Sequence, residues 1–593
     1  MLAVTRNSIA AALLQTTFLP LAVSALAAQP HSAVQAKARS CDAGNGGITL
    51  PQGFCATIFA DNIGHARHLV VAPNGVVYVN TWSGRYYGND TPHAGGFLVA
   101  LQDTKGDGHA DVNVRFGSDT ASGNAGGTGI ALYHDGLYAE TNDKIVRYSL
   151  PAGAIAPTAA PQTVISGLPL TGDHPMHPIA IDAQGHLYVD LGSATNSCQS
   201  QNRTLKSPGI QPCTELETRA GTWFYDANRT GQIFSPAERF VTGLRNGEGI
   251  SFDSSGRIFA TMHGRDQLRE NWPESYTPPQ GANEPAEELV ELQRGSDYGW
   301  PYCYYGVEQK RLVLAPEYGG DGGKKIGVCA TKREPIATFP AHWAPLSLQF
   351  YAGTQFPTAY RGGAFIAFHG SWNRAPFPQE GYNLVFQPLA NGKPSGSYRV
   401  FADGFAGAEK DPGGAVHRPT GVAVGPDGAL YVAEDQHGRI WRITYEGPAT
   451  TPLESAPAPK NIVAAQASTA LPPEGIHPNA GSDIAGMPIP QGATAADLAL
   501  GSRVFHGQIA DTTCTGCHGL NGEGTPLGPN LTNGKWLWGD GSVGSIKSII
   551  TNGVPQPKDF RSPMPPMGGA QLTPAQVTAT AEYIWALNHR SHG

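Results

Sequence analysis

Charge is scarce in this chain of 593 residues, and long apolar runs are missing beyond its N-terminus. Only 15% of the residues are charged, and the net charge is −8. A basic surface that could follow a nucleic-acid backbone is therefore not expected, which argues against nucleic acid as a partner. No segment after residue 23 carries the run of about 18 apolar residues that a membrane-spanning helix needs. The sequence therefore predicts no transmembrane span.

The N-terminus has the features of a secretory signal. Arg6 supplies a positive charge, residues 8–23 are largely apolar, and Ala25-Leu26-Ala27 fits a small-residue cleavage site. Polar residues and Pro20 interrupt the apolar run, so a permanent membrane span is the weaker interpretation. We expect a signal peptide over residues 1–28 that is cleaved, and a periplasmic mature chain.

Cysteine is also sparse, and two of the eight cysteines lie together in Cys514-Thr515-Gly516-Cys517-His518. This spacing is typical of a c-type haem site, where both thiols attach to the haem and the adjacent His binds the iron. A redox dithiol would not need His518, and half of a zinc site would need a second Cys or His pair, which residues 519–588 lack. We predict one covalent haem c held by Cys514 and Cys517, with His518 as an axial ligand.

Met564, in a Pro-rich segment, is the predicted second iron ligand, because Met opposite His raises the potential of the iron. Met567 is the alternative. Helical patterns occur around Asp497 to His506 and again from Thr573-Pro574 onward. Residues 496–593 resemble a class I cytochrome c domain, and in similar cytochromes the Met that precedes the Pro pair is the ligand.

The other six cysteines form an even set, which suits disulfides in an oxidising compartment. Proximity along the chain favours the pairs Cys41–Cys55, Cys198–Cys213 and Cys303–Cys329. Buried free thiols are the alternative, and the predicted export disfavours them.

An apolar strand, a turn and a second apolar strand recur six times between residues 47 and 445. The copies are His68–Asn80, Gly129–Glu140, Pro178–Asp190, Gly249–Thr261, Leu348–Phe368 and Gly421–Ala433. Repeated hairpins with little helical pattern between them indicate a β-propeller, here with six blades, whereas a β-sandwich would not need six similar hairpins. We predict an all-β six-bladed β-propeller over residues 40–446, a Pro/Ala-rich linker over 447–495 and a small all-α cytochrome c domain over 496–593.

Polar residues stand at the mouths of these hairpins, where the inner strands meet the central channel. They are Arg67, His174, Arg245, Asn246, His342 and Arg418 before the strands, and Trp82, His263, Gly264, Arg265, His369, Trp372 and Asp435 after them. Each alone could simply bond loop carbonyls. Together they favour an anionic ligand with a flat ring system, held near a potential general base.

Several motifs give this face a specific resemblance. Gly172-Asp173-His174, Gly243-Leu244-Arg245-Asn246 and Tyr298-Gly299-Trp300-Pro301 occur in this order in the soluble quinoprotein glucose dehydrogenases. The motifs His342-Trp343-Ala344-Pro345, Phe350-Tyr351-Ala352-Gly353 and His369-Gly370-Ser371-Trp372-Asn373-Arg374 are similar to the L-sorbosone dehydrogenase branch of that family. The resemblance covers nearly all of residues 47–445. It implies a six-bladed propeller that holds pyrroloquinoline quinone and calcium at its central face.

Position by position, the resemblance implies that His174 is the general base and that Arg245 lies beside the reacting quinone carbonyl. It implies that the backbone carbonyls of Gly264 and Arg265 bind the calcium. The other predicted quinone contacts are Arg67, Asn246, His369, Trp372 and Arg418. Two departures stand out: a Lys that contacts the quinone in the glucose enzymes has no clear match, and position 247 is Gly where Pro is usual.

These features predict a periplasmic quinohaemoprotein dehydrogenase that oxidises a sugar, aldehyde or alcohol. Electrons would leave through the fused haem to a cytochrome, a copper protein or a membrane oxidase. One alternative is a carbohydrate-binding propeller fused to an electron-relay cytochrome c. Another is a lactonase-type hydrolase, which would need several carboxylates around its metal where this face is cationic.

One further motif, Asp103 to Asp111, resembles part of a calcium-binding loop. Lys105 occupies a position where an acid is needed, and no Glu closes the loop. The sequence therefore favours an Asp/Gly turn here.

Overall fold

The computed structural model describes residues 41–590, apart from residues 83–93, 118–125, 152, 204–205, 375–376, 409, 411–414, 459–483, 485, 507–511, 513, 520–521, 523, 525–526, 561–562 and 571. The predicted signal peptide and the middle of the predicted linker lie outside this range. No helix in the described part of the chain is long and apolar enough to cross a membrane.

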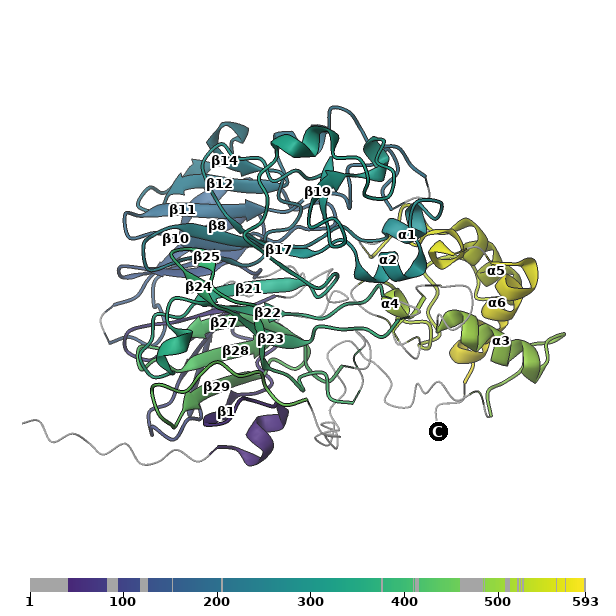
Figure 1. Cartoon of the computed structure of the whole chain (residues 1–593). Helices are drawn as coiled ribbons and strands as arrows, with labels where there is room; N and C mark the ends of the chain where they lie inside the picture. The colour runs from purple at the N-terminus through teal and green to yellow at the C-terminus, as the bar shows by residue number, and fades with distance from the viewer. Residues whose placement is uncertain are drawn as a thin grey trace, which may run out of the picture. The chain divides into compact units, whose positions relative to one another are not determined.

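Six sheets, antiparallel except for the parallel edge pair β9–β13, form the blades of a β-propeller (Figure 1). The first three blades are β2 (Ala66–Val71), β3 (Val77–Thr81), β4 (Leu98–Gln102) and β5 (Val112–Phe116); β6 (Ile130–Tyr133), β7 (Gly136–Thr141), β8 (Lys144–Ser149) and β9 (Gln162–Ser166), with β13 (Gln232–Ile233) added at the edge; and β10 (Ile179–Ile181), β11 (His186–Leu191), β12 (Gly221–Asp226) and β14 (Arg239–Thr242). The last three are β15 (Ile250–Phe252), β16 (Ile258–Met262), β17 (Glu287–Glu291) and β20 (Ala337–Phe339); β21 (Pro345–Phe350), β22 (Ala364–Phe368), β23 (Asn383–Gln387) and β26 (Arg399–Ala402); and β27 (Pro419–Val424), β28 (Leu430–Glu434), β29 (Ile440–Tyr445) and β1 (Phe54–Ala60).

The six predicted hairpins are the inner strand pairs of the six blades, so the prediction of a six-bladed propeller is confirmed. The pairs are β2–β3, β6–β7, β10–β11, β15–β16, β21–β22 and β27–β28. Their turns require residues that adopt positive φ, as Gly256 does at φ +81° between β15 and β16. Alternating apolar residues on these strands pack between neighbouring blades.

The ring closes because its first strand joins its last blade. β1 pairs antiparallel with β29, with Phe54 opposite Tyr445 and Ile58 opposite Trp441. Phe54 packs edge-on against Phe356 and Phe401 of the preceding blade, with ring centroids 4.8 Å apart in both pairs. The closure joins the two ends of the propeller in one sheet and holds the ring of blades together.

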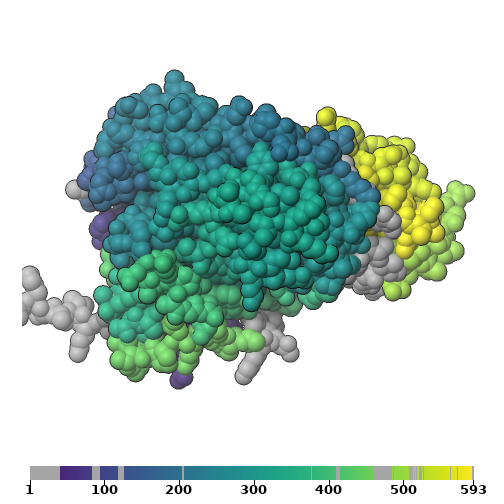
Figure 2. Space-filling view, turned by 45° about the horizontal axis from the view of Figure 1, so that its top comes forward, coloured from purple at the N-terminus to yellow at the C-terminus, as the bar shows by residue number. Residues whose placement is uncertain are grey.

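Long connections decorate the propeller and contain its short helices and extra hairpins. α1 (Leu268–Asn271) and α2 (Pro278–Asn283) lie between β16 and β17, the hairpin β18 (Cys303–Gly306) to β19 (Arg311–Leu314) follows β17, and β24 (Leu389–Ala390) pairs with β25 (Lys393–Pro394). The 3-10 helices of the propeller are η1 (Ala43–Gly47), η3 (Thr214–Glu217), η4 (Pro236–Glu238), η5 (Pro316–Tyr318), η6 (Gly327–Thr331) and η7 (Thr358–Tyr360). In Figure 2 the teal residues of these connections fill the middle of the visible propeller surface.

The three predicted disulfides are present: Cys41–Cys55, Cys198–Cys213 and Cys303–Cys329. The first ties the start of the described chain to β1, and the other two close long connections.

The Asp103 loop is an Asp/Gly turn, as predicted: the Asp103 carboxylate accepts hydrogen bonds from the backbone N–H groups of Gly106 (2.6 Å) and Gly108 (2.7 Å). The beginning of the linker lies along the propeller, because the Ala456 N–H donates to the Val400 carbonyl at 2.8 Å.

The C-terminal region is helical, with α3 (Ala495–Phe505), α4 (Cys514–His518), α5 (Val543–Asn552), η8 (Pro566–Gly569) and α6 (Pro574–Asn588). Capping boxes begin α3 at Thr494 and α6 at Thr573. Gly501 lets the two helices cross closely, since a Cβ at this position would lie 2.0 Å from the Ala579 carbonyl oxygen. The small apolar core of this region contains residues from α3, α5 and α6.

Candidate active site and haem crevice

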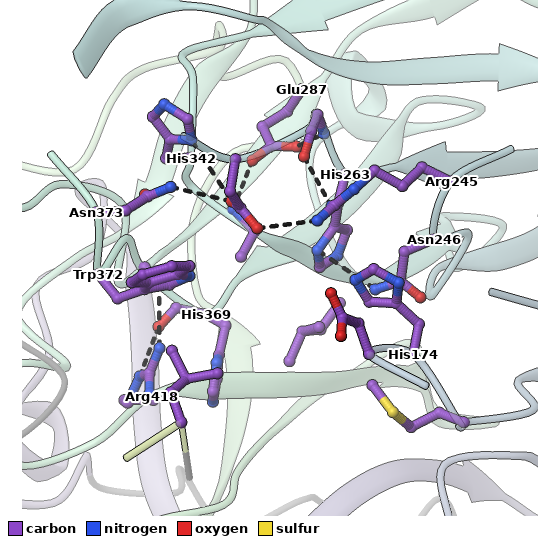
Figure 3. A pocket seen from close by; sticks show the side chains of 18 of the residues that line it. His174, Arg245, Asn246, His263, Glu287, His342, His369, Trp372, Asn373 and Arg418 are labelled. Atoms are coloured by element: carbon purple, nitrogen blue, oxygen red, sulfur yellow. Dashed lines mark hydrogen bonds and ion pairs between the residues drawn. The ribbon is translucent and has the colours of Figure 1, made fainter. Parts of the chain in front are cut away.

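An open cavity with ≈ 980 Å³ of empty space lies at the channel mouth of the propeller (Figure 3). Seven of the nine residues predicted as the base, quinone contacts or calcium ligands are brought together on its wall: His174, Arg245, Asn246, Gly264, His369, Trp372 and Arg418. The hairpin-mouth residues His263 and His342 also line it, as do Asp173, Arg203, Asp266, Glu287 and Asn373.

His174 has a defined tautomer. Its Nδ1 lies 3.0 Å from both the carbonyl oxygen and the Oγ of Ser193. The Ser193 hydroxyl donates to the Thr195 carbonyl at 2.6 Å, so both Ser193 oxygens act as acceptors and Nδ1 must carry the proton. Nε2 is therefore the free, basic nitrogen. Burial lowers the pKa of His174 well below its usual value, and the charges of Arg245 and Arg203 lower it further, so the imidazole is neutral at pH 7.

Arg245 is fixed by four hydrogen bonds. Nε donates to the Asn196 carbonyl (3.0 Å), Nη1 to the Gly264 carbonyl (2.8 Å), and Nη2 to both the Asn196 side-chain oxygen and Asp266 Oδ2 (2.9 Å each). The guanidinium is 2% exposed, so its charge acts in a site with little solvent screening. A rigid cation of this kind can stabilise negative charge that develops on a nearby oxygen.

Asp266 joins several of the basic residues. Its carboxylate accepts from Arg203 (3.0 Å), Arg245 (2.9 Å) and Asn373 (3.0 Å), and His342 Nδ1 lies 3.9 Å away. Burial alone would raise the pKa of Asp266, but the Arg245 and Arg203 guanidiniums outweigh burial and hold it below its usual value. Asp266 follows directly after the His263-Gly264-Arg265 motif, so its position along the chain was a signal that the sequence prediction did not use.

Glu287 is a second buried carboxylate on the cavity wall. Its two oxygens accept from the Gly264 N–H (2.8 Å) and the Ala344 N–H (3.0 Å). Burial raises the pKa of Glu287 to about 8, although these two hydrogen bonds oppose the shift. No sequence signal identified Glu287, because it begins β17, a strand of sequence EELVE that is not one of the predicted hairpin strands.

The opposite wall combines an imidazole, an indole and a guanidinium. His369 Nε2 lies 2.9 Å from Asp435 Oδ1, and burial lowers the pKa of His369 to about 4. Arg418 donates to the carbonyls of His369 and Gly370, at 3.1 Å each. The flat face of Trp372 lies beside these groups (Figure 3) and offers a stacking surface for a planar ring.

Of the nine residues predicted as the base, quinone contacts or calcium ligands, two do not present their side chains to this cavity. Arg67 is 1% exposed, donates to Asp435 at 2.9 Å and is not on the cavity wall, so the expected ligand contact of Arg67 is replaced by a buried ion pair. The Arg265 guanidinium donates to the buried Glu317 carboxylate at 2.5 Å, which leaves only its backbone carbonyl to serve a metal. In both cases a buried acidic partner, unseen in the sequence, holds the guanidinium.

The two departures from the glucose enzymes have local explanations. The Gly247 N–H donates to Asp190 at 3.1 Å, a bond that Pro at this position could not make, and a Cβ there would lie 2.6 Å from that carboxylate. Arg374 does not replace the missing Lys, because its guanidinium donates to the Ala282 carbonyl at 2.5 Å.

A second cavity, with ≈ 830 Å³ of empty space, lies within the helical C-terminal region. Cys517, His518 and Met564 line it, and its other walls are mostly apolar, including Trp536, Leu537, Ile546, Ile550 and Ile584. Such a slot excludes water from a flat apolar group, as a haem crevice must.

The iron ligands predicted from the sequence face this crevice. His518 Nδ1 lies 2.9 Å from the Pro529 carbonyl, which orients the ring and leaves Nε2 free to bind iron. Burial lowers the pKa of His518, which keeps it in the neutral, ligating form. Met564 lines the crevice and Met567 does not, which favours Met564 as the second ligand. Cys514 begins α4 and packs against the same apolar core.

Comparison with known proteins gives these cavities a family context. The TrAA12-like family matches residues 48–446, and the cytochrome c family matches residues 501–588. This chain belongs to the TrAA12-like family. It is a TrAA12-like propeller followed by a C-terminal cytochrome c domain.

Among curated proteins, the TrAA12-like propeller is similar to the pyrroloquinoline quinone-dependent pyranose dehydrogenase of Coprinopsis cinerea. The two are 28% identical over 251 residues, which are 35% of this chain and 32% of that protein. The cytochrome domain is 37% identical over 79 residues to the cbb3-type cytochrome c oxidase subunit FixP of Rhizobium etli, covering 13% of this chain and 27% of that subunit. The chain thus spans less than half the length of these relatives.

Solved structures support the same fold for the TrAA12-like propeller. The holo form of the pyranose dehydrogenase PQQ domain from Coprinopsis cinerea aligns with a TM-score of 0.53 and 18% identity, over 67% of this chain and 97% of that one. The calcium structure of the Trichoderma reesei family AA12 enzyme aligns with a TM-score of 0.54 and 19% identity, over 68% of this chain and 97% of that one. At these identities the likeness shows the propeller fold alone.

Proposed function

We propose that this chain is a periplasmic quinohaemoprotein dehydrogenase. It oxidises a sugar, aldehyde or alcohol with pyrroloquinoline quinone and delivers the electrons to its own haem c. The observation that carries the proposal is the pairing of a neutral imidazole, His174, with a fixed buried guanidinium, Arg245, in a cavity of a chain that also has a haem crevice. The pyranose dehydrogenase among its relatives is named as dependent on the same quinone.

The cavity residues fit the quinone, a planar tricarboxylate. Trp372 offers a flat surface, while Arg245 and Arg418 provide two guanidiniums along the wall. Arg–carboxylate contacts of this kind are strong and directional. When bound, the quinone supplies a two-electron, hydride-accepting centre.

Calcium also fits the oxygen atoms that remain available. Each Glu287 oxygen accepts one backbone hydrogen bond and keeps a second acceptor site. Of the two carbonyls predicted from the resemblance, that of Gly264 already accepts from Arg245 at 2.8 Å, so only its second lone pair could serve a metal. Asp266 is a poorer candidate, because its Oδ2 already accepts from both Arg203 and Arg245, whose positive charges would repel a metal ion at this carboxylate. Calcium accepts such mixed carboxylate and carbonyl sets, with remaining positions filled by other oxygens.

The residues of the chain perform the proton chemistry. His174 Nε2 accepts the proton of the substrate hydroxyl while Nδ1–H stays bonded to Ser193, which holds the ring in place. The Arg245 charge stabilises negative charge that develops on the acceptor oxygen. The open cavity lets the proton on Nε2 exchange with solvent afterwards.

The C-terminal domain completes the path of the electrons. Cys514, Cys517, His518 and Met564 would hold the haem, and the apolar walls of the crevice would exclude water from it. When bound, haem c supplies a one-electron carrier. We expect an external acceptor, a cytochrome, a copper protein or a membrane oxidase, to take the electrons in the periplasm.

The test is reconstitution of the full chain with quinone and calcium, followed by a panel of sugars, aldehydes and alcohols. We expect substrate to reduce the haem, and His174→Gln to slow the reduction by about 10²–10⁴-fold, the usual worth of a general base. Ile233→Thr, a change at a 73% exposed residue outside the cavity, is the matched control and should reduce at the wild-type rate.

Two outcomes would count against the proposal. Haem that stays oxidised across the panel would leave the alternative of a carbohydrate-binding propeller with an electron-relay cytochrome. That alternative predicts no tight quinone binding, which an absorbance titration with the quinone measures directly. Equal reduction rates in His174→Gln and wild type would remove His174 as the base.

A further inference from the structure

Arg203 is a buried cation in a constrained segment that connects β11 to β12. Its side chain is 5% exposed, and its backbone has φ +55°, which is uncommon for a residue with a side chain. The Cys198–Cys213 disulfide closes this segment, and Cys198 also has positive φ, at +51°. The Gln199 side-chain oxygen accepts from the Arg203 N–H at 3.1 Å and supports the unusual conformation. Backbone held in this way is characteristic of positions that serve a site.

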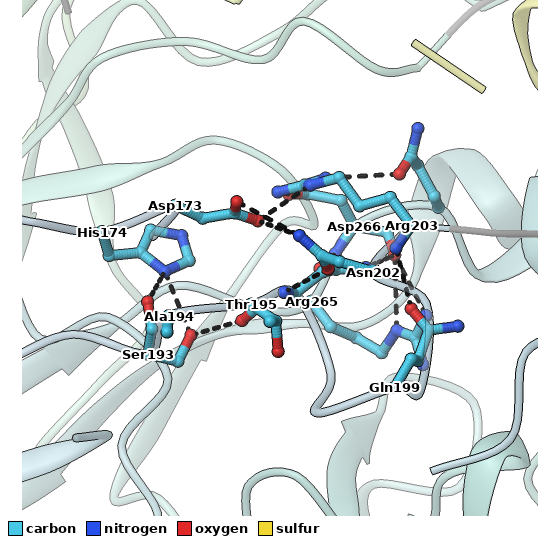
Figure 4. A network of polar contacts seen from close by, with 12 residues as sticks. Asp173, His174, Ser193, Ala194, Thr195, Gln199, Asn202, Arg203, Arg265 and Asp266 are labelled. Carbon is cyan, nitrogen blue, oxygen red and sulfur yellow. Dashed lines mark hydrogen bonds and ion pairs between the residues drawn. The ribbon is translucent and has the colours of Figure 1, made fainter. Parts of the chain in front are cut away.

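The Arg203 guanidinium bridges two carboxylates of the cavity wall (Figure 4). Nε donates to Asp173 at 2.9 Å and Nη2 donates to Asp266 at 3.0 Å, while Nη1 donates to Gln267 at 3.3 Å. The planar fork reaches all three partners at once, which the single ammonium of Lys cannot do with the same geometry. Arg203 therefore links the segment before His174 to the carboxylate that also holds Arg245.

Asp173 connects the Arg203 guanidinium to the backbone of His174. It is the residue directly before His174, and its carboxylate also accepts from Asn202 Nδ2, at 3.2 Å to each oxygen. The Asp173 N–H donates to the Ala194 carbonyl at 2.8 Å, next to Ser193, which holds the His174 ring. The backbone around His174 is thus anchored by the Arg203 segment on one side and by residues 193–194 on the other.

Charge gives Arg203 a second effect on His174. The charged and titratable groups that act most strongly on the imidazole are Arg245, Arg203, His263 and Asp266, and Asp173 precedes it directly in the chain. The two guanidiniums disfavour a proton on His174, and Asp266 favours one. Arg203 and Arg245 together balance Asp173 and Asp266, so the loss of one guanidinium leaves a net negative charge beside the imidazole.

We propose that Arg203 is a positioning residue that fixes Asp173 against the base and keeps the His174 imidazole neutral, so that Nε2 can accept a proton. The proposal deepens the proposed function and rests on it for the role of His174. Its structural content, a charge that controls the protonation of one named imidazole, can be tested without any cofactor.

The experiment compares wild type, Arg203→Gln and Arg203→Lys as full chains free of quinone. Diethyl pyrocarbonate reacts with neutral imidazole, and mass spectrometry of the peptide that contains His174 gives the reaction rate between pH 4 and pH 8. At the pH where Arg203→Gln has lost half of its maximal rate, we expect wild type and Arg203→Lys to retain about nine-tenths of theirs. The Lys variant keeps the positive charge. We therefore expect only the Gln variant to shift the pH profile of the reaction rate of His174.

A matched control separates this effect from a loss of folding. Arg442 is also a buried guanidinium, 3% exposed and paired with Asp427, but it lies outside the cavity. Arg442→Gln should leave the His174 profile unchanged even where thermal unfolding shows it to be destabilised to the same degree as Arg203→Gln.

The proposal is overturned if the reaction rate of His174 depends on pH in the same way in wild type and Arg203→Gln, whether the profiles are flat or sloping. It is also overturned if the profile of Arg203→Lys shifts as far as that of Arg203→Gln. In the quinone-loaded chain, kcat/KM of Arg203→Gln should fall with decreasing pH about one pH unit above the fall in wild type, and the two should agree at higher pH, where His174 is neutral in both. If the loaded wild type does not reduce its haem, the proposed function fails while the carbethoxylation result still decides the role of Arg203.

Discussion

Replacement of Asp266 by Asn should destabilise the propeller severely. The carboxylate is 13% exposed and receives Arg203 and Arg245 at 3.0 and 2.9 Å. At an effective dielectric constant of about 20, each ion pair contributes about 4 kcal/mol of attraction at 4 Å separation. The amide keeps one acceptor oxygen but no charge, so two buried guanidiniums would share Asp173 alone. Breaking a buried ion pair from one side costs about 3–5 kcal/mol, and we expect a loss in that range.

The loss should also depend on pH. The pKa of Asp266 is held below its usual value in the folded chain. The carboxylate therefore stabilises the fold above the pKa of the unfolded state, about 4, and this contribution is lost as the pH falls through the lower folded pKa. The free energies of unfolding of wild type and Asp266→Asn should differ by a constant amount from pH 8 down to about pH 4.5. Below that pH the difference should shrink.

Urea unfolding of the full chain, followed by tryptophan fluorescence, measures this difference. The control is Asp135→Asn, which removes an ion pair of similar length, 2.8 Å to Arg147, whose carboxylate is 62% exposed. Such exposed pairs contribute at most about 1 kcal/mol. A loss at Asp266 no greater than that at Asp135 would refute the claim that Asp266 is the charge that neutralises the two guanidiniums.

Three further predictions concern other parts of the chain. Replacing Cys198 and Cys213 by Ser opens a loop of sequence separation 15 and should cost about 3 kcal/mol of unfolding free energy, measured against wild type in urea. Met564→Leu should lower the haem reduction potential in a redox titration, whereas Met567→Leu should leave it unchanged, because only Met564 lines the crevice. Burial raises the pKa of Glu287 to about 8 in the cofactor-free fold. The free energy of unfolding should therefore fall by about 1.4 kcal/mol per pH unit between about pH 4.5 and pH 8 because of this group. Urea unfolding of Glu287→Gln across this range should lack that slope.

The parts of the structure that repeat or carry a fixed spacing could be predicted from the sequence. Six hairpins predicted six blades because each hairpin has its own alternation and turn. The Cys514 to His518 spacing located the haem crevice, and Thr573-Pro574 marked the start of α6 because a capping Thr before Pro is a strong helix signal. Local chemistry was sufficient in all of these cases.

The charge balance of the cavity could not be predicted in the same way. Arg203 reaches it from a long connection and Glu287 from the start of β17, and only the tertiary fold brings them beside His174 and Arg245. Arg67 shows the converse: its place at a hairpin mouth suggested a ligand contact, but the partner that it contacts, Asp435, lies 368 positions away in the sequence. The sequence showed which cations gather at the face, and the structure shows that acids neutralise most of them.

The most direct test of the account is anaerobic mixing of an oxidisable sugar with the quinone- and calcium-loaded chain while the haem absorbance is followed. The account predicts that the haem is reduced, with a rate constant that does not change when the protein is diluted, because donor and acceptor sites belong to one chain. Haem that remains oxidised, or a rate that falls in proportion to protein concentration, would contradict it.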